Sequence, residues 1–485
     1  MEKSEGGVMA GMRENLARLR ERGVDPYPTR AARTHWTKDV VDGFAAVEGR
    51  EVAVAGRLTA IRGHGKAAFA DLEDGRGKLQ IYVREDVVGP ERFALWRLFD
   101  LGDIVGARGE VMKTRSGEVS VKVVSFEMLA KALRPLPEKW HGLRDTEQRS
   151  RHRYLDLIAN EDSRRVFALR SAVVSGIRRF LEERGFLEVE TPILQPIYGG
   201  AFARPFTTHH YALDMPLYLR IADELYLKRL IVGGFERVYE IGKDFRNEGM
   251  DRTHSPEFTQ LELYQAYSDY EGMMELTESM IIRLADGILG TRTLPWRDGT
   301  IDLSPPWKRL RVTDAVAEAV GVPRAASRDA LLTAAKAAGL ELDGSESHGA
   351  IVERILADRV EPGLVQPTFL VDYPREISPL AKAAPGEGDL VERFEVFIGG
   401  LELGNSFTEL NDPDEQRRRF EGQQALREGG DLEAQGMDED FLQALEHGMP
   451  PTGGLGIGVD RLVMLLTDSW NIRDVLLFPA MRQED

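Results

Sequence analysis

From residue 235 the chain reads Phe-Glu-Arg-Val-Tyr-Glu-Ile-Gly-Lys-Asp-Phe-Arg-Asn-Glu-Gly, and from residue 254 it reads His-Ser-Pro-Glu-Phe-Thr-Gln-Leu-Glu-Leu-Tyr. In an extended strand, residues two apart in the sequence point to the same side. The second stretch therefore predicts a strand with one polar and aromatic face, made of Phe258, Gln260, Glu262 and Tyr264. In the first stretch, Arg246 and Glu248 share a face if that segment is extended.

Two later stretches extend this pattern. Asn405, Phe407 and Glu409 alternate in the same way, and residues 454–461 read Gly-Leu-Gly-Ile-Gly-Val-Asp-Arg. Alternating polar residues usually mean only that one face of a sheet is exposed to solvent. Here the polar faces lie in long apolar surroundings and carry aromatic residues beside the charges, which favours a binding site. Strict alternation does not place Glu402 with Asn405, although a β-bulge near Gly404 would correct the register.

The composition sets the broad class of protein. The 485 residues suggest about three domains, and the 42% hydrophobic and 29% charged residues are ordinary for a globular protein. Cysteine is absent, which excludes disulfides and thiolate metal sites and fits a reducing, cytosolic compartment. We expect no signal peptide and no membrane span. The net charge of −17 is unusual for a protein that binds nucleic acid and, taken alone, favours a small cationic ligand.

The N-terminal part predicts a short helix followed by a small barrel. Apolar residues recur with helical spacing over residues 9–22, and Gly23 ends the pattern. A period of two then predicts five short strands, separated by glycine-rich turns, over residues 52–58, 67–71, 79–83, 104–111 and 119–126. Five short strands in so small a segment suit an OB-fold barrel.

The remainder predicts mixed helices and strands. Residues 135–153 read as a polar linker. A long amphipathic helix over residues 165–184 ends at Gly185, and a strand over residues 186–192 is closed by Pro192. Further helices are expected over residues 325–339, 412–428 and 439–447. Dinucleotide-binding and P-loop glycine patterns and the signatures of class I synthetases are absent.

The quoted stretches resemble the motifs of class II aminoacyl-tRNA synthetases. The stretch over residues 235–264 is similar to motif 2, residues 454–461 to motif 3, and the helix, strand and proline of residues 165–192 to motif 1, which forms the dimer interface in that family. The flanking residues resemble the bacterial type of lysyl-tRNA synthetase. The resemblance implies an α+β protein with a helical extension (1–48), an anticodon-binding OB-fold barrel (49–134), a linker (135–160) and a catalytic domain built on an antiparallel sheet flanked by helices (161–485).

The resemblance also implies a nucleotide site. Arg246 matches the arginine that contacts the α-phosphate of ATP, and Arg461 matches the one that contacts the γ-phosphate. These two are the expected catalytic residues. Phe258 matches the aromatic residue that stacks on adenine, and Glu248 and His254 match nearby nucleotide contacts. Glu395 and Glu402 match the carboxylates that hold Mg²⁺, an ion that prefers oxygen ligands.

The amino-acid pocket distinguishes members of this family. The residues that match the lysine pocket are Gly200, Glu224, Glu262, Tyr264, Asn405, Phe407 and Glu409. Carboxylates suit a substrate that carries one ammonium group at its α-carbon and another on its side chain. Family members often carry an arginine just before the motif 2 histidine; Thr253 stands here, and Arg252 precedes it.

In the barrel, the residues that match the family's anticodon-reading face are Phe69, Gln80 and Glu118. Phe69 would stack on a base, and the other two would bond base edges. Since Phe69 lies between Ala68 and Ala70, alternation leaves open whether it faces outward or into the core.

Taken together, these features predict an ATP- and Mg²⁺-dependent ligase that joins lysine to its tRNA as a cytoplasmic homodimer. Two alternatives remain open at this point. One is a related class II enzyme, either an aspartyl- or asparaginyl-tRNA synthetase or a lysyl-type paralogue that modifies proteins. The other is a non-catalytic RNA-binding protein derived from a synthetase.

Overall fold

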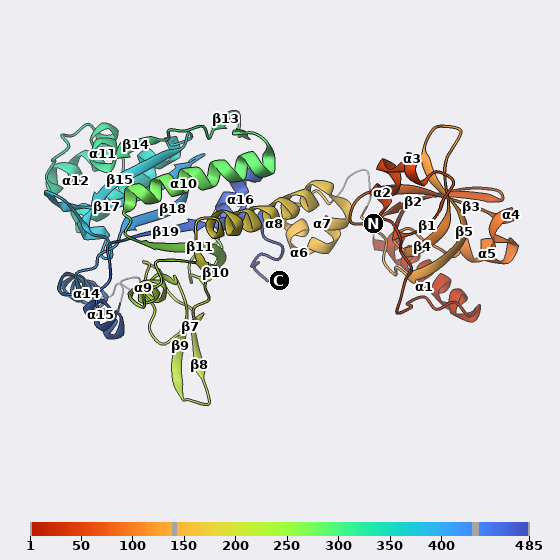
Figure 1. The fold of residues 1–485 in the computed structure, drawn as a ribbon, viewed down its shortest axis with the longest axis horizontal. Helices are drawn as coiled ribbons and strands as arrows, with labels where there is room; N and C mark the ends of the chain where they lie inside the picture. The colour runs from red at the N-terminus through yellow and green to blue at the C-terminus, as the bar shows by residue number, and fades with distance from the viewer. Residues whose placement is uncertain (1, 138–142, 429–435, 484–485) are drawn as a thin grey trace. The chain divides into compact units, whose positions relative to one another are not determined.

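The computed structural model describes residues 2–137, 143–428 and 436–483. The chain divides into two compact units, Met1–Arg144 and Asp145–Asp485, which are described separately (Figure 1). None of the described helices is both long and apolar enough to cross a membrane.

The first unit is built around a closed five-stranded barrel with the order β1-β2-β3-β5-β4. Its strands are β1 (Glu51–His64), β2 (Ala67–Glu73), β3 (Lys78–Arg84), β4 (Ile104–Lys113) and β5 (Val119–Ala130). Its helices are α1 (Glu2–Glu21), α2 (Thr37–Asp42), α3 (Phe44–Val47), α4 (Glu85–Val88) and α5 (Pro90–Trp96). The predicted barrel is confirmed: each predicted strand is present, and alternate residues such as Val54, Ile81 and Val121 are fully buried inside it.

The predicted N-terminal helix is confirmed as α1, which begins earlier than expected. Leu19 is completely buried and belongs to the same hydrophobic cluster as the barrel interior, as does Val40 of α2. The helical extension therefore shares one core with the barrel.

The second unit contains a nine-stranded sheet with the order β14-β15-β17-β18-β19-β11-β10-β6 and with β16 paired to β17. Most neighbours are antiparallel, while β14–β15 and β6–β10 are parallel. The strands of this sheet are β6 (Leu187–Glu188), β10 (Arg237–Phe245), β11 (Glu257–Ala266), β14 (Lys308–Arg311), β15 (Thr368–Pro374), β16 (Ala383–Ala384), β17 (Glu387–Ile398), β18 (Leu401–Thr408) and β19 (Thr452–Gly458). Two small sheets consist of β7 (Leu194–Gln195), β8 (Thr207–His210) and β9 (Met215–Leu219), and of β12 (Thr293–Trp296) and β13 (Gly299–Asp302).

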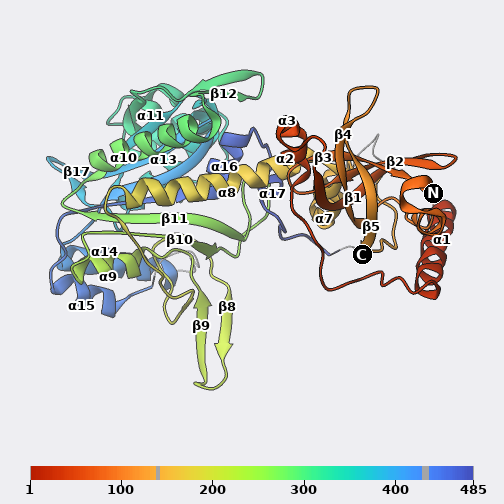
Figure 2. The same cartoon turned by 45° about the vertical axis from the view of Figure 1, so that its right-hand side comes forward.

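Helices flank this sheet, as Figure 2 shows. The helices of the second unit are α6 (Thr146–Arg151), α7 (Arg153–Ala159), α8 (Glu161–Glu182), α9 (Glu224–Val232), α10 (Tyr270–Leu284), α11 (Val312–Val320), α12 (Arg328–Ala337), α13 (His348–Ile355), α14 (Pro413–Glu428), α15 (Glu439–Glu446), α16 (Val459–Thr467) and α17 (Ile472–Val475). The expected helices near residues 165–184, 325–339, 412–428 and 439–447 are confirmed as α8, α12, α14 and α15.

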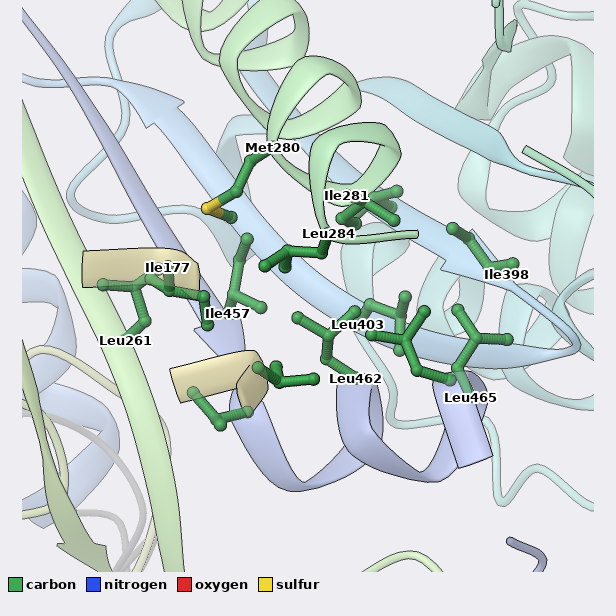
Figure 3. Packing of buried hydrophobic residues seen from close by; sticks show 14 of the residues in the cluster. Ile177, Leu261, Met280, Ile281, Leu284, Ile398, Leu403, Ile457, Leu462 and Leu465 are labelled. Atoms are coloured by element: carbon green, nitrogen blue, oxygen red, sulfur yellow. The ribbon is translucent and has the colours of Figure 1, made fainter. Parts of the chain in front are cut away.

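The main core lies between one face of the sheet and helices α8, α10 and α16 (Figure 3). Ile177 of α8, Met280 of α10 and Leu462 of α16 meet Leu261 of β11 and Ile457 of β19 there, all of them fully buried. Burial on this scale contributes about 1.5–3 kcal/mol for each large apolar side chain. The other face of the same strands is thereby left for polar residues.

Two local expectations differ from the structure. The strand expected over residues 186–192 is limited to β6, because the backbone N–H and hydroxyl of Thr191 donate to the Glu240 carboxylate at 2.9 and 2.8 Å rather than to a neighbouring strand. Residues 145–160 were assigned to a polar linker but form α6 and α7 of the second unit. The charged side chain of Arg153 in this segment is buried and paired. It is 1% exposed and donates to Asp156 and to the carbonyl oxygens of Arg473 and Leu477.

Candidate active site

A cavity of about 400 Å³ opens on the polar face of the large sheet. Every residue that the sequence assigned to the catalytic part lines it: Gly200, Glu224, Arg246, Glu248, His254, Phe258, Glu262, Tyr264, Glu395, Glu402, Asn405, Phe407, Glu409 and Arg461. These residues come from distant parts of the chain. The structure therefore brings the predicted phosphate, metal and amino-acid residues into one space.

Strand alternation accounts for much of this convergence. Phe258, Gln260, Glu262 and Tyr264 of β11 all line the cavity, as do Asn405 and Phe407 of β18. The suggested β-bulge is present, since Val396 of β17 pairs with Gly404 whereas Phe397 pairs with Glu402. The additional residue is Leu403, which is buried in the core. Glu402 thus faces the cavity despite its odd spacing from Asn405.

A turn, and not an extended strand, places Arg246 and Glu248 at the cavity. Strand β10 ends at Phe245, and the backbone N–H of Glu248 donates to the Arg246 carbonyl at 2.9 Å, so this segment turns instead of remaining extended. The condition under which strand alternation would align the two residues is therefore not met, although both line the cavity. The Arg246 guanidinium carbon lies 5.1 Å from the centre of the Phe258 ring, within the range of a cation–π contact.

Arg461 is held by two neighbouring residues, Glu402 and His254. It donates to the carbonyl oxygen of Glu402 at 2.7 Å and to its carboxylate at 3.2 Å. It also contacts Nε2 of His254 at 2.9 Å, while Nδ1 of the same ring lies 2.7 Å from Asp251. The consistent assignment is that Nδ1–H donates to Asp251 and Nε2 accepts from Arg461. Thr253 lines the cavity near Arg461, whereas the Arg252 side chain is exposed and does not line it.

The glycines of β19 form the floor of the cavity. A Cβ atom on Gly454 would lie 1.9 Å from Oε1 of Glu409 and 2.5 Å from the Tyr264 ring. A Cβ on Gly456 would lie 3.0 Å from the Gln260 amide. Any side chain at Gly454 would displace two cavity residues, which explains why glycine stands there.

At one end of the cavity Glu224 and Glu409 share a buried cation. The ammonium group of Lys228 lies 2.5 Å from Glu224 and also forms an ion pair with Glu409, and all three side chains are almost inaccessible to solvent. Burial raises the pKa of Glu409 to about 8 against the opposing effect of Lys228. Burial lowers the pKa of Lys228 less than the two carboxylates raise it, so its pKa lies above the usual value and Lys228 is charged.

Three further carboxylates, Asp223, Asp244 and Glu262, gather beside this region and are buried. Burial, and then the negative charges of Asp223 and Asp244, raise the pKa of Glu262 well above its usual value. Both oxygens of Glu262 already accept hydrogen bonds, from Gln260 at 2.9 Å and from Tyr264 at 3.1 Å. Such a cluster attracts a cation, and Glu262 is its member that lines the cavity.

The two glutamates expected to hold a metal fit a magnesium ion. Burial raises the pKa of Glu395, and the neighbouring charge of Glu402 raises it further against the effect of Arg393. Two carboxylates that repel one another are stabilised by a divalent cation, and both offer oxygen ligands. The Tyr373 hydroxyl donates to Glu395 at 2.8 Å, and Arg393 donates to it at 2.5 Å. The fixed position of Glu395 favours metal binding.

Sequence reasoning missed four residues of interest. Lys228 follows Glu224 by one helical turn, and Arg393 precedes Glu395 by two residues on β17, so helical and strand spacing could have indicated both. Asp223 and Asp244 gave no such signal, because only tertiary packing brings them to Glu262.

In the first unit, the outer face of the barrel carries Phe69, Gln80 and Glu118. Ala68 and Ala70 are buried in the core, so Phe69 faces outward, where its ring stacks on Tyr82 with the ring centres 4.3 Å apart. Gln80 accepts from Ser120 at 2.9 Å, and its amide lies 3.4 Å from the Glu118 carboxylate. On this face Phe69 is partly exposed and Glu118 is exposed, whereas Gln80 is only 8% exposed and is held by Ser120 and Glu118.

The pKa of Glu409 gives a testable pH dependence. If the cavity binds a cationic substrate, the Glu409 carboxylate must be ionised, and because burial raises its pKa, protonation of Glu409 should weaken binding as pH falls. The Michaelis constant for lysine should therefore fall as pH rises from 6.5 towards 8, by up to about tenfold per pH unit. Steady-state exchange kinetics at several pH values measure this, with the Michaelis constant for ATP as the control. A lysine constant that does not change over this range contradicts the assignment of Glu409.

Comparison with known proteins agrees with this geometry. Residues 145–482 match the model of the family described as tRNA synthetases class II (D, K and N), and residues 52–129 match the OB-fold nucleic acid binding domain. The chain belongs to the class II tRNA synthetases of this D, K and N group.

Individual proteins of this group resemble the chain over nearly its full length. The chain is 54% identical over 485 residues to the lysine–tRNA ligase of Moorella thermoacetica, covering 100% of this chain and 99% of the relative. It is also 54% identical over 482 residues to the enzyme of the same name from Pelotomaculum thermopropionicum, covering 99% and 95% of the two chains. The lysine–tRNA ligase of Bacillus subtilis is 52% identical over 480 residues, with 97% and 96% covered.

Proposed function

We propose that this protein is an ATP-dependent lysine–tRNA ligase. The observation that carries the proposal is the arrangement of one cavity, in which two arginines suited to phosphate lie beside a cluster of buried carboxylates suited to ammonium groups. The relatives named lysine–tRNA ligase, which match the chain over nearly its full length, support the same assignment.

In the first step the lysine carboxylate attacks the α-phosphorus of ATP, and the bond to pyrophosphate breaks to give lysyl-adenylate. Arg246 and Arg461 stabilise the negative charge of the phosphates, and Phe258 supplies a surface for adenine. No protein nucleophile is required, so catalysis consists of positioning and electrostatic stabilisation. Glu395 and Glu402 would hold magnesium, which when bound neutralises phosphate charge.

The pocket residues select the amino acid. Glu224, Glu262 and Glu409 face the two ammonium groups of lysine, and Tyr264, Asn405 and Phe407 form the other walls with the Gly200 backbone. In the second step the 3′-terminal ribose hydroxyl of the tRNA attacks the lysyl carbonyl carbon and AMP leaves.

A pyrophosphate exchange assay, run in turn with each of the standard amino acids, tests the proposal. Exchange that depends on lysine supports it. Exchange with aspartate or asparagine would favour the related synthetases, which the acidic pocket disfavours. No exchange with any amino acid would favour a non-catalytic RNA-binding protein derived from a synthetase.

We expect the outer face of the barrel to bind the tRNA anticodon. Stacking on a base is worth about 1–3 kcal/mol, so Phe69→Ala should weaken tRNA binding roughly tenfold or more. Exchange without tRNA should not change, because that chemistry belongs to the second unit. Binding to lysine tRNA and lysine-dependent exchange are measured on one preparation, with thermal stability as a check.

Tyr27→Ala is the matched control for this variant, since Tyr27 is a 44% exposed aromatic residue of the same unit whose hydroxyl donates to the Lys131 carbonyl, whereas Phe69 stacks on Tyr82. Equal losses of tRNA binding and exchange in Phe69→Ala, or a lowered melting temperature without a selective loss of tRNA binding, would remove Phe69 from the binding surface.

The proposal includes a cytoplasmic homodimer. Four exposed apolar residues lie in or directly after the region that resembles motif 1 and support such an interface: Leu187, Ile193, Leu194 and Ile197 are each more than 40% exposed. The tRNA substrate expected from the family supports a cytoplasmic location.

A further inference from the structure

Lys228 lies behind the amino-acid end of the cavity and is absent from its lining. It is completely buried on α9, one helical turn after Glu224. Its ammonium group lies 2.5 Å from Oε1 of Glu224, forms an ion pair with Oε2 of Glu409, and stands 6.0 Å from the centre of the Tyr264 ring. One resident cation therefore connects the two carboxylates that line this end of the cavity.

Each carboxylate keeps one oxygen that Lys228 does not use. Oε2 of Glu224 lies 3.7 Å from the position that a Cβ would take on Gly200, so it faces the Gly200 backbone. Oε1 of Glu409 lies against Gly454, and no donor among the described residues forms a hydrogen bond with it. A buried oxygen without a donor is costly, and a ligand ammonium group would satisfy it. The two remaining oxygens thus mark two places for positive charge.

We propose that Lys228 is a positioning residue that sets the distance between Glu224 and Glu409 and so selects the length of a diamino substrate. The inference rests on the proposed function, in which the acidic residues face the two ammonium groups of lysine, and it assigns one of these groups to Glu224 and the other to Glu409. Because one ammonium group holds both carboxylates from behind, neither can move towards a shorter ligand without breaking a buried ion pair. Breaking such a pair leaves an uncompensated buried charge. Ornithine, which is one methylene shorter than lysine, should therefore be a poor substrate.

The experiment compares Lys228→Met with the wild type in pyrophosphate exchange, using lysine and ornithine. The methionine side chain fills similar space without the charge. The Michaelis constant for lysine should rise at least about tenfold, while the constant for ATP should remain near its wild-type value. The ratio of kcat/KM for lysine to that for ornithine should fall, because the carboxylates can then adapt to the shorter chain.

Lys131→Met provides a matched control. Lys131 is also a fully buried lysine between two carboxylates, with its ammonium 2.6 Å from Asp100 and 2.9 Å from Asp103, but it belongs to the first unit. Its replacement removes an equivalent ion pair and should leave the lysine-to-ornithine ratio unchanged. If Lys228→Met does not fold, Lys228→Arg keeps the charge while altering its reach, and the ratio should again change.

The outcomes are distinguishable. Wild-type exchange without lysine dependence would reject the proposed function itself. Lysine-dependent wild-type exchange, together with a folded Lys228 variant whose lysine-to-ornithine ratio is unaltered, would reject the role of Lys228 alone. Equal increases in the lysine and ATP constants with an unaltered ratio would show that Lys228 only supports the fold.

Discussion

Replacement of Arg246 by alanine is expected to lower lysine-dependent pyrophosphate exchange by about 10²- to 10³-fold while leaving the fold intact. Among the described residues the Arg246 side chain forms no salt bridge, and its hydrogen bond to the Ile221 carbonyl is long at 3.4 Å. Its guanidinium is therefore available to a phosphate group and contributes little to the fold. A phosphate that gains charge during the reaction is stabilised most in the transition state, so kcat should fall more than the affinity for ATP.

Arg237→Ala is the matched control for this variant. Arg237 is the first residue of β10, the strand that Arg246 directly follows; it is exposed and does not line the cavity. Exchange rates and melting temperatures of both variants are compared with those of the wild type. Near-normal exchange by Arg246→Ala would exclude it from the catalytic residues.

Replacement of Glu262 by glutamine should weaken lysine binding far more than ATP binding. Glu262 is 3% exposed and stands beside Asp223 and Asp244, and the change removes its charge while keeping its size. Losing one charge-assisted hydrogen bond costs about 1.5–3 kcal/mol, which corresponds to roughly a 10- to 150-fold rise in the Michaelis constant for lysine. The two Michaelis constants, measured by exchange, separate this effect from a general loss of activity.

Glu257→Gln is the control, because Glu257 is an exposed glutamate of the same strand that lies outside the cavity. It should leave both constants near their wild-type values. If the lysine constant of Glu262→Gln also stays at the wild-type value, Glu262 does not contact the substrate.

The sequence predicted the parts of this protein that depend on local periodicity. The barrel strands and helix α8 follow from regular spacing of apolar residues, and the face of β11 follows from strict alternation. The sequence does not predict whether the Phe69 side chain points outward or into the barrel, because the alanines on either side of it are compatible with a core and with a surface. Packing of both alanines into the barrel decides it.

The features that the sequence did not predict depend on tertiary contacts. The charge-rich segment around Arg153 resembled a solvated linker, yet its charges are paired internally with Asp156 and with carbonyl groups near residues 473–477. Asp223, Asp244 and Glu262 likewise belong to three separate segments of the chain. They meet only in the folded structure, so no short-range sequence pattern predicts their contact. Charge alone does not distinguish an exposed group from a buried and compensated one.

The glycine floor of the cavity restricts the order in which its specificity could evolve. A substitution at Gly454 alone would collide with Glu409 at 1.9 Å, so it would disrupt the acidic pocket before any new preference could appear. A prior change at Glu409 to a smaller residue would remove the closer of two collisions, and the Tyr264 ring, 2.5 Å from the same Cβ position, would still have to move or be replaced. Gly454 is thus epistatic with both residues, and a mutational path towards a smaller or uncharged substrate must change residues 409 and 264 before residue 454.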